Sequence, residues 1–221
     1  MKPSLLPQAQ NWNYYWGLDQ SKVFTKISWS KKRIMSILDE YALKGKHALD
    51  AGCGSGFFSK YFCGKGMKVV ALDYSDEALK ITQEQTHGQV KVVKENLVSV
   101  SLLNSLREKF DLVFTDGLLE HFSSNDQDKI IKNLSGVLNP GGVLVTFVPN
   151  LFSPWELIRP FYMPGIAEKP FTLRGLMALN TRNHLKVIQK GGINTLPFPF
   201  SPDRILGPAF GMLLYTISQH D

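Results

Sequence analysis

The stretch ALDAGCGSGFF, residues 48–58, combines three glycines and a carboxylate in a pattern suited to binding a nucleotide-like ligand. Gly52, Gly54 and Gly56 allow the backbone to turn sharply and approach a ligand closely, and a helix that follows such a turn points its amino end at the ligand. Asp50 lies two residues before the first glycine. A carboxylate there would repel the pyrophosphate of a dinucleotide, so Asp50 indicates a ligand that presents a cation to the turn.

A second acid, Asp73, ends the apolar run KVVALD. An acid at the end of the strand that follows a glycine turn is placed to accept hydrogen bonds from two ribose hydroxyl groups. A ligand with adenosine at one end and an amino-acid ammonium at the other would use Asp73 for the ribose and Asp50, directly or through water, for the ammonium. S-adenosylmethionine is such a molecule.

The segments around these acids alternate between strand and helix patterns. Short runs rich in β-branched residues, nearly continuous in hydrophobicity, are typical of a parallel sheet that is covered on both faces. These runs are 47–51, 68–73, 90–95, 111–116 and 142–148. Helical patterns lie between them at 56–64, 75–85 (with Ser75 as N-cap) and about 125–138, the last ended by Asn139-Pro140-Gly141-Gly142. This order predicts an α/β fold with a doubly wound, Rossmann-like sheet.

Two regions flank the alternating core. We expect one domain in three parts: 1–46 as a helical extension or lid, 47–150 as the cofactor-binding core, and 151–221 as an acceptor-side insertion with closing strands. The first part has an aromatic cluster, NWNYYW, and a helix at about 29–43. The last part begins with a segment rich in proline and aromatic residues. A helix at about 172–190, ending at Gly191-Gly192, and two weaker strands near INTLPF and MLLYTIS follow it.

The composition is that of a soluble globular domain. Of 221 residues, 43% are hydrophobic and 20% charged, which argues against wholesale disorder. The longest apolar-rich run, ILGPAFGMLLYTI, is too short for a membrane span and is broken by glycine and proline, and the amino terminus lacks the apolar stretch of a secretory signal. Cys53 and Cys63 belong to no cluster with zinc-ligand spacing. We therefore expect a reduced, cytoplasmic protein without a metal site.

In order and spacing, these segments resemble the class I S-adenosylmethionine-dependent methyltransferases, in particular the quinone-biosynthesis and related small-molecule group. LDAGCGSG is similar to the family's first motif, ALDYS to its second, VVKENL to its adenine-side segment, and NPGGVLVTFVPN to the turn and fifth strand that close its cofactor domain. The resemblance covers 47 to about 150. It implies a seven-stranded, mostly parallel sheet with helices on both faces, S-adenosylmethionine as cofactor and S-adenosylhomocysteine as product.

Carried onto this sequence, the resemblance implies a set of cofactor-binding residues. They are Asp50, Gly52, Cys53, Gly54, Gly56, Asp73, Tyr74, Asn96, Leu97, Thr115 and Asp116. In the family the glycines line the methionine part, Tyr74 packs beside the adenine, and Thr115 and Asp116 lie beside the sulfonium. Asn96 stands where the family usually has an aspartate on the adenine amino group, and its amide oxygen can accept the same hydrogen bond.

The segment DGLLEHFSSN resembles the glutamate–histidine pair of those small-molecule enzymes. His121 is the candidate catalytic base for a hydroxyl acceptor, although a structural role fits its position equally well, and Glu120 fits a structural or cofactor-side role. The family's lid segments imply an acceptor pocket with aromatic walls, formed by Tyr14, Tyr15, Trp16, Trp155, Phe161 and Tyr162. Such walls suit an apolar or planar acceptor and also favour the sulfonium cation.

The sequence disfavours some alternative functions and leaves others open. A nicotinamide dehydrogenase is disfavoured because Tyr61 and Lys65, which form a Y-x-x-x-K, fall in the helix behind the glycine turn. Nucleic acid is disfavoured because no Pro-Pro-aromatic motif follows the fourth strand, and because Lys22, Lys26, Lys31, Lys32, Arg33, Lys44 and Lys46 lack interleaved aromatic residues. RNA stays a minority hypothesis. A non-catalytic S-adenosylmethionine-binding module and a lipid acceptor with peripheral membrane contact stay open, since the protein is basic and its end apolar.

Overall fold

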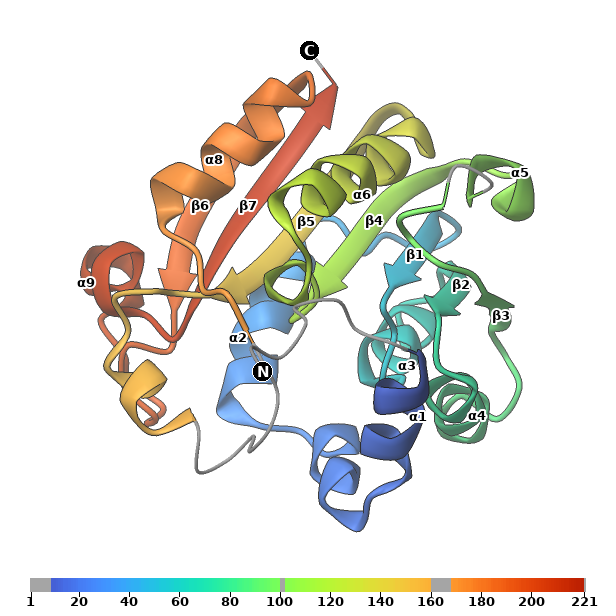
Figure 1. Cartoon of the computed structure of the whole chain (residues 1–221), viewed down its shortest axis with the longest axis horizontal. Helices are drawn as coiled ribbons and strands as arrows, with labels where there is room; N and C mark the ends of the chain where they lie inside the picture. The colour runs from blue at the N-terminus through green and yellow to red at the C-terminus, as the bar shows by residue number, and fades with distance from the viewer. Residues whose placement is uncertain (1–8, 100–101, 160–167, 221) are drawn as a thin grey trace.

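The computed structural model describes residues 9–99, 102–159 and 168–220. Their centre is a seven-stranded sheet with the order β3-β2-β1-β4-β5-β7-β6 (Figure 1). The strands are β1 (His47–Ala51), β2 (Lys68–Asp73), β3 (Lys91–Lys94), β4 (Phe110–Asp116), β5 (Leu138–Pro149), β6 (Leu185–Ile193) and β7 (Leu213–His220). The helices that precede the sheet are α1 (Ala9–Gly17), η1 (Asp19–Thr25) and α2 (Trp29–Leu38). The others are α3 (Phe57–Gly64), α4 (Asp76–Gln85), α5 (Leu102–Leu106), η2 (Leu119–His121), α6 (Ser124–Gly136), η3 (Pro154–Leu157), α8 (Leu173–Arg182) and α9 (Asp203–Phe210).

Strands β1 to β5 pair in parallel, and β7 lies antiparallel between β5 and β6. The chain runs outward from β1 through β2 to β3, returns to the centre at β4, and continues outward through β5. The predicted doubly wound, mostly parallel sheet is therefore confirmed. The change of direction between β1 and β4 leaves a crevice at the carboxyl ends of these strands, which is where open α/β sheets bind ligands.

Two apolar layers join the helices to the sheet. On one face Val113 of β4 belongs to the same buried cluster as Leu134 of α6, together with residues of α5 and α8. On the other face Phe114 contacts Phe62 of α3, with ring centroids 5.6 Å apart, in a cluster that also includes α2 and α4. Neighbouring strand residues point to opposite faces. Because both faces are covered, the strands read as nearly continuous apolar runs.

Most predicted elements of the core agree with the structure. The hydroxyl of Ser75 accepts a hydrogen bond from the backbone N–H of Ala78 at 3.2 Å, which confirms it as the N-cap of α4. Strand β5 begins earlier than expected, at Leu138, so the predicted stop signal 139–142 lies inside the strand's bounds. The register between β4 and β5 shifts at this point, because Phe110 pairs with Leu138 but the next pairs begin beyond the signal.

The predicted helix at 172–190 is wrong in its second half. Helix α8 ends at Arg182, His184 takes a left-handed φ of 60°, and β6 follows. Pairing with β7 outweighs the helical pattern there. Of the segment INTLPF only Ile193 belongs to a strand, as the last residue of β6, and the residues after it form a loop. MLLYTIS does form a strand, β7, and no helix in the described parts of the chain is long and apolar enough to cross a membrane.

The amino-terminal extension is helical, as expected, and α1 lies against α4. The side-chain oxygen of Asn13 accepts from the hydroxyl of Ser75 at 2.7 Å and from the backbone N–H of Glu77 at 3.3 Å. In Figure 1 α1 lies at the end of the sheet where the arrowheads of β1, β2 and β4 are drawn. The extension therefore covers the carboxyl ends of the central strands.

Candidate active site

A cavity of about 1070 Å³ opens at the carboxyl ends of β1, β2 and β4. Its wall combines the glycine turn with the ends of these strands and with aromatic side chains of α1 and η3. Pockets for single small molecules commonly measure about 300–1,000 Å³. This cavity has room for a nucleoside-sized ligand and a second small molecule beside it.

The glycine turn forms one wall of the cavity. Gly52, Gly54 and Gly56 have φ values of 79°, 48° and 70°, a region that other residues rarely adopt. A Cβ on Gly54 would lie 2.5 Å from Cζ2 of Trp16, so only glycine lets α1 close over the turn. Gly56 lies outside the lining, and a Cβ there would lie 2.6 Å from the Cα of Thr82. Gly56 thus permits the packing of α3 on α4.

Asp50 lies at the end of β1, buried in the wall of the cavity. Its Oδ2 accepts a hydrogen bond from the Ser59 hydroxyl at 2.6 Å. Burial raises the pKa of Asp50 to about 7, because the negative charge has lost its water. A cationic group bound in front of Asp50 would offset that cost. This geometry fits the ammonium end of an amino acid.

Asp73 ends β2 and is held by two backbone donors. Its Oδ2 accepts from the N–H of Gly54 at 3.0 Å, and its Oδ1 accepts from the N–H of Ser75 at 2.9 Å. Burial nevertheless raises the pKa of Asp73 above its usual range. Each carboxylate oxygen can accept more than one hydrogen bond, so Asp73 can still receive two hydroxyl groups from the cavity it lines.

The predicted adenine-side residues lie together on the cavity wall. Tyr74, which is 43% exposed, Asn96 and Leu97 all line it. The Oδ1 of Asn96 accepts from the N–H of Val98 at 3.0 Å, which orients the amide and leaves one acceptor position on that oxygen. Of the remaining predicted cofactor residues, Cys53 and Asp116 line the cavity, whereas Thr115 is buried and lies outside the lining.

Aromatic side chains form the opposite wall. Tyr15, Trp16 and Trp155 line the cavity as predicted, and Trp12 joins them. Tyr14 lies outside the lining and is 72% exposed. The predicted pocket residues Phe161 and Tyr162 lie outside the described residues. Burial, and to a lesser degree Glu168, raises the pKa of Tyr15 to about 12, so its hydroxyl stays protonated at neutral pH.

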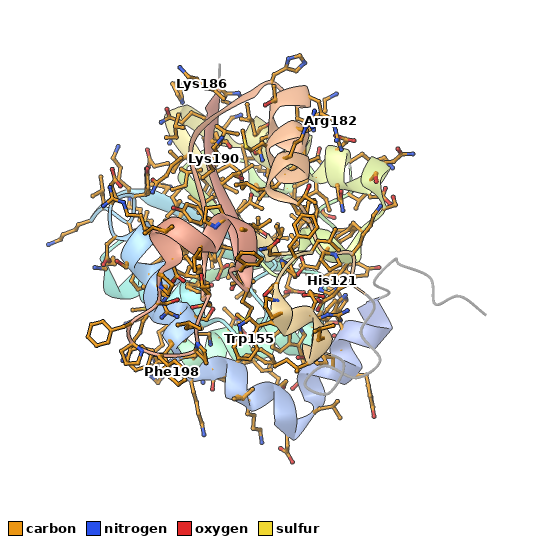
Figure 2. The ribbon with its side chains drawn as sticks, turned by 90° about the vertical axis from the view of Figure 1, so that its left-hand side faces the viewer. His121, Trp155, Arg182, Lys186, Lys190 and Phe198 are labelled. Carbon is orange, nitrogen blue, oxygen red and sulfur yellow. The ribbon has the colours of Figure 1, made fainter. Side chains whose placement is uncertain are left out.

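His121 lies beside this aromatic wall. It is buried in the cavity wall at the end of η2, and Figure 2 shows it on the same side of the molecule as Trp155. Its imidazole packs edge to face against Trp12, with ring centroids 4.8 Å apart. The α1 extension therefore helps to orient the candidate base.

Two glutamates accompany His121. The Oε2 of Glu120 is buried without a hydrogen-bond partner among the described residues, and burial followed by the charge of Glu168 raises the pKa of Glu120 well above its usual range. Burial also raises the pKa of Glu168 to about 7, although Arg159 lies 3.3 Å away and opposes the shift. This burial favours the protonated form of Glu120, which can donate a hydrogen bond.

Glu120, His121 and Glu168 each place one potential ligand atom within 4.8 Å of the other two. Carboxylate and imidazole ligands suit several divalent metal ions. The sequence spacing did not predict this group, because Glu168 comes from the segment after β5 and its pairing with Arg159 depends on the tertiary fold. Our expectation of no metal site therefore stays a prediction.

Lys31 is a site residue that the sequence analysis counted only as part of a basic run. Its ammonium donates to the carbonyl oxygens of Phe24 and Lys26, the latter at 2.9 Å, and lies 4.1 Å from the ring centroid of Phe57. Burial lowers the pKa of Lys31 to about 8, while burial raises that of nearby Asp116 to about 6. Both residues line the cavity. No local signal separates Lys31 from the neighbouring Lys32 and Arg33, because its place in the cavity wall depends on the tertiary fold.

The residues of the rival dehydrogenase motif have another role. Tyr61 donates a hydrogen bond to Asp39 at 2.6 Å, and the Lys65 ammonium lies 2.6 Å from the same carboxylate. Neither residue lines the cavity. They fasten α3 to the end of α2 and cannot reach a ligand on the glycine turn.

Comparisons with known proteins agree with this geometry. Residues 49–146 match the family model described as a methyltransferase domain. A ubiquinone biosynthesis O-methyltransferase of Coxiella burnetii is 30% identical over 112 residues, 51% of this chain and 47% of that protein. A ribosomal-protein methyltransferase of Campylobacter concisus is 32% identical over 117 residues, 50% of this chain and 42% of that protein. The chain thus spans about half the length of the curated relatives it matches.

Solved structures extend the similarity to nearly the whole fold. The N-methyltransferase NodS of Bradyrhizobium japonicum, crystallised with S-adenosylhomocysteine, has a TM-score of 0.68 at 15% identity, covering 96% of this chain and 97% of that one. A magnesium protoporphyrin IX methyltransferase of Synechocystis, crystallised with bound S-adenosylhomocysteine, has a TM-score of 0.63 at 14% identity, covering 86% of this chain and 81% of that one.

Proposed function

We propose that the protein transfers a methyl group from S-adenosylmethionine to a small, apolar or aromatic acceptor. The methyltransferase-domain match over residues 49–146 and the similarity of the fold to that of NodS support this proposal. The observation that supports this most is a single cavity that joins the acids of the glycine turn to an aromatic wall. One end fits an adenosine and an ammonium, and the other end fits a planar molecule.

The chain's own residues bind and orient the two ligands. Asp73 receives the ribose hydroxyls, Asp50 faces the ammonium, and Tyr74 covers the adenine. When bound, S-adenosylmethionine supplies a methyl group on a positively charged sulfur that is a good leaving group. The remaining requirement is alignment of the acceptor and exclusion of water, which Trp12 and Trp16 of α1 provide by closing the cavity over the turn.

A hydroxyl acceptor must also lose its proton. We propose that the imidazole of His121 accepts it, since it lies in the wall on the acceptor side with its ring fixed by Trp12. Burial favours the protonated form of Glu120, which can donate a hydrogen bond to the acceptor or to the imidazole. If the acceptor has no proton to lose during methyl transfer, His121 only holds the loop after β4 in place.

The test is incubation of the purified protein with methyl-labelled S-adenosylmethionine and a metabolite extract. We expect label in a small, organic-soluble product, and no label in RNA or protein added separately. Asp73→Ala serves as the control that binds cofactor poorly. Label in RNA or protein would redirect the proposal, and binding of cofactor without transfer to any fraction would favour a non-catalytic module.

A further inference from the structure

Exposed apolar side chains are concentrated at one end of the molecule. Apart from Leu43 and Ile188, the strongly exposed large hydrophobic side chains of the described residues come from three regions. These regions are the extension through the start of α2, the segments that follow β2 and β5, and the segment 194–212 between β6 and β7. These regions all lie at the carboxyl end of the sheet. The mouth of the cavity lies at the same end.

Several strongly exposed residues lie in a loop and a helix between β6 and β7. Phe198 is 60% exposed and Phe200 is 90% exposed, and Ile205 of α9 is 79% exposed. In Figure 2 Phe198 and Trp155 lie toward the same end of the molecule, whereas Lys186 and Arg182 lie at the opposite end. Water solvates these rings poorly, so an exposed apolar patch of this kind marks an interaction surface.

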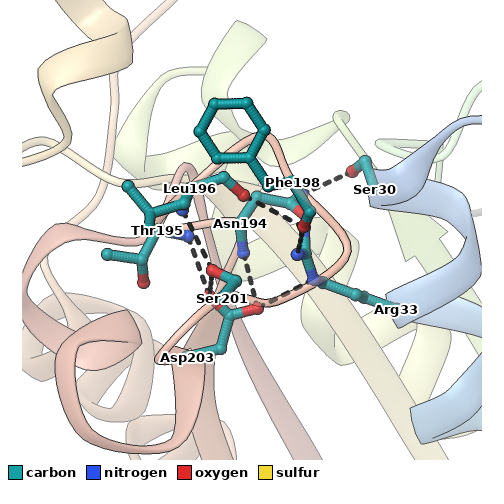
Figure 3. Close-up of polar contacts among 8 residues, drawn as sticks. All are labelled: Ser30, Arg33, Asn194, Thr195, Leu196, Phe198, Ser201 and Asp203. Carbon is teal, nitrogen blue, oxygen red and sulfur yellow. Dashed lines mark hydrogen bonds and ion pairs between the residues drawn. The ribbon is translucent and has the colours of Figure 1, made fainter.

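A polar network holds the phenylalanine loop in place (Figure 3). The guanidinium of Arg33 donates to the side chain of Asn194 at 2.5 Å and to the carbonyl of Phe198, and its Nε lies 3.1 Å from Asp203. Asp203 in turn accepts from the backbone N–H groups of Asn194 and Thr195 at 3.0 and 2.8 Å. The loop is therefore tied to α2 and to α9 by its polar groups, and the rings of Phe198 and Phe200 remain outside.

Basic side chains surround the beginning of α2, to which Arg33 ties this loop. Lys26 and Lys32 are exposed, and the ammonium of Lys32 lies 4.4 Å from the ring centroid of the exposed Trp29. The formal net charge of the chain is +6. Aromatic side chains next to lysines are typical of surfaces that lie in the interface of an anionic membrane, where rings enter the acyl boundary and ammonium groups contact lipid phosphates.

We propose that this surface, formed by residues 23–32 and 196–210, docks on anionic lipid bilayers. Charge complementarity favours a negatively charged lipid surface as the occupant, because the exposed rings are bordered by exposed lysines. Docking would turn the mouth of the cavity toward the bilayer. An apolar acceptor could then enter the cavity from the membrane without crossing water, a consequence that rests on the proposed function, whereas docking itself does not.

Flotation with lipid vesicles tests the proposal without any activity assay. We expect the wild-type chain to float with vesicles of phosphatidylcholine and phosphatidylglycerol, and to stay at the bottom of the gradient with phosphatidylcholine alone. Binding should weaken between about 0.01 M and 1 M salt, as the Debye length falls from about 30 to 3 Å. Wild-type protein left at the bottom with anionic vesicles at low salt would overturn the proposal.

Variants locate the binding surface. Phe198→Ser with Phe200→Ser should lower the partition coefficient roughly tenfold or more, since two rings lose their burial, and Lys26→Glu with Lys32→Glu should abolish the preference for anionic lipid. Leu43→Ser with Ile188→Ser is the matched control, because it removes two exposed apolar side chains elsewhere. Equal flotation of the phenylalanine variant and the wild type would reject this surface. Light scattering that shows a dimer lost in the phenylalanine variant, without flotation, would instead assign the surface to a second copy.

Discussion

Replacing Asp73 with alanine should lower both the stability of the ligand-free protein and its affinity for the cofactor, and the two losses can be measured separately. The carboxylate contacts two backbone donors of the protein, at Gly54 and Ser75, and it faces the cavity. The ligand-free variant therefore leaves two N–H groups without this acceptor, at about 1–3 kcal/mol each if no water replaces it. The bound state loses the charge-assisted hydrogen bonds to the ribose as well, and we expect about 1–3 kcal/mol of lost binding free energy.

Titration calorimetry with S-adenosylhomocysteine measures the binding term, and urea unfolding monitored by circular dichroism measures the stability term. We expect affinity to fall roughly 5- to 150-fold in Asp73→Ala. Asp73→Asn keeps one oxygen acceptor and should retain more of the stability than of the affinity. Asp39→Ala is the control. The Asp39 carboxylate also contacts two donors of the protein, Tyr61 and Lys65, but it lies away from the cavity. Affinity within twofold of wild type in Asp73→Ala would refute the ribose assignment.

Four further predictions address the rest of the site. His121→Ala should lower turnover roughly 10²–10⁴-fold with little change in the affinity for S-adenosylhomocysteine, and the pH–rate profile should lose its acidic limb. Near-normal turnover of this variant with the true acceptor would remove His121 from the mechanism. In urea unfolding, Gly56→Ala should lower the free energy of unfolding by roughly 1–3 kcal/mol more than Gly88→Ala. Both glycines have a similar positive φ, but only a Cβ at Gly56 would meet Thr82. Equal losses would mean that the strain of the positive φ accounts for the whole effect. Because the folded-state pKa of Asp50 is raised from 3.8 to about 7, the folded chain holds this proton more tightly than the unfolded chain, so the stability of the ligand-free protein should fall as pH rises from about 4 to 7. In urea titrations, Asp50→Asn should reduce this fall of the free energy of unfolding with pH. An unchanged dependence on pH would mean that a group other than Asp50 causes it. Treatment with EDTA should leave methyl transfer unchanged, because Arg159 already pairs with Glu168 and burial disfavours the charged form of Glu120. Lost activity that added Mg²⁺ restores would assign this group as a metal site.

The cofactor half of the cavity was predictable because its determinants are local in the chain. The glycine turn, Asp50 and Asp73 occupy adjacent strand ends, and the parallel register of β1 and β2 brings them together at one edge. Periodicity could also have sorted the aromatic cluster. Trp12, Tyr15 and Trp16 share one face of a helix, whereas Tyr14 falls on the other, in agreement with their places in the structure.

The acceptor half was less predictable because it depends on contacts between distant segments. Arg159 and Glu168 follow β5, yet they meet Glu120 from the loop after β4. Burial turns Lys31 from a surface residue into a cavity residue, and no pattern in SKKR signals that burial. The second half of the predicted helix at 172–190 failed for a related reason, since β6 exists only because β7 pairs with it.

Titration calorimetry of the wild-type chain tests the central claim, that this cavity is an S-adenosylmethionine site, most directly. The cavity geometry predicts one mole of S-adenosylmethionine or S-adenosylhomocysteine bound per mole of chain, with affinity that rises with pH as Asp50 ionises to meet the ammonium. NAD should give no heat of binding. Binding of NAD, with no measurable affinity for S-adenosylhomocysteine, would contradict the account.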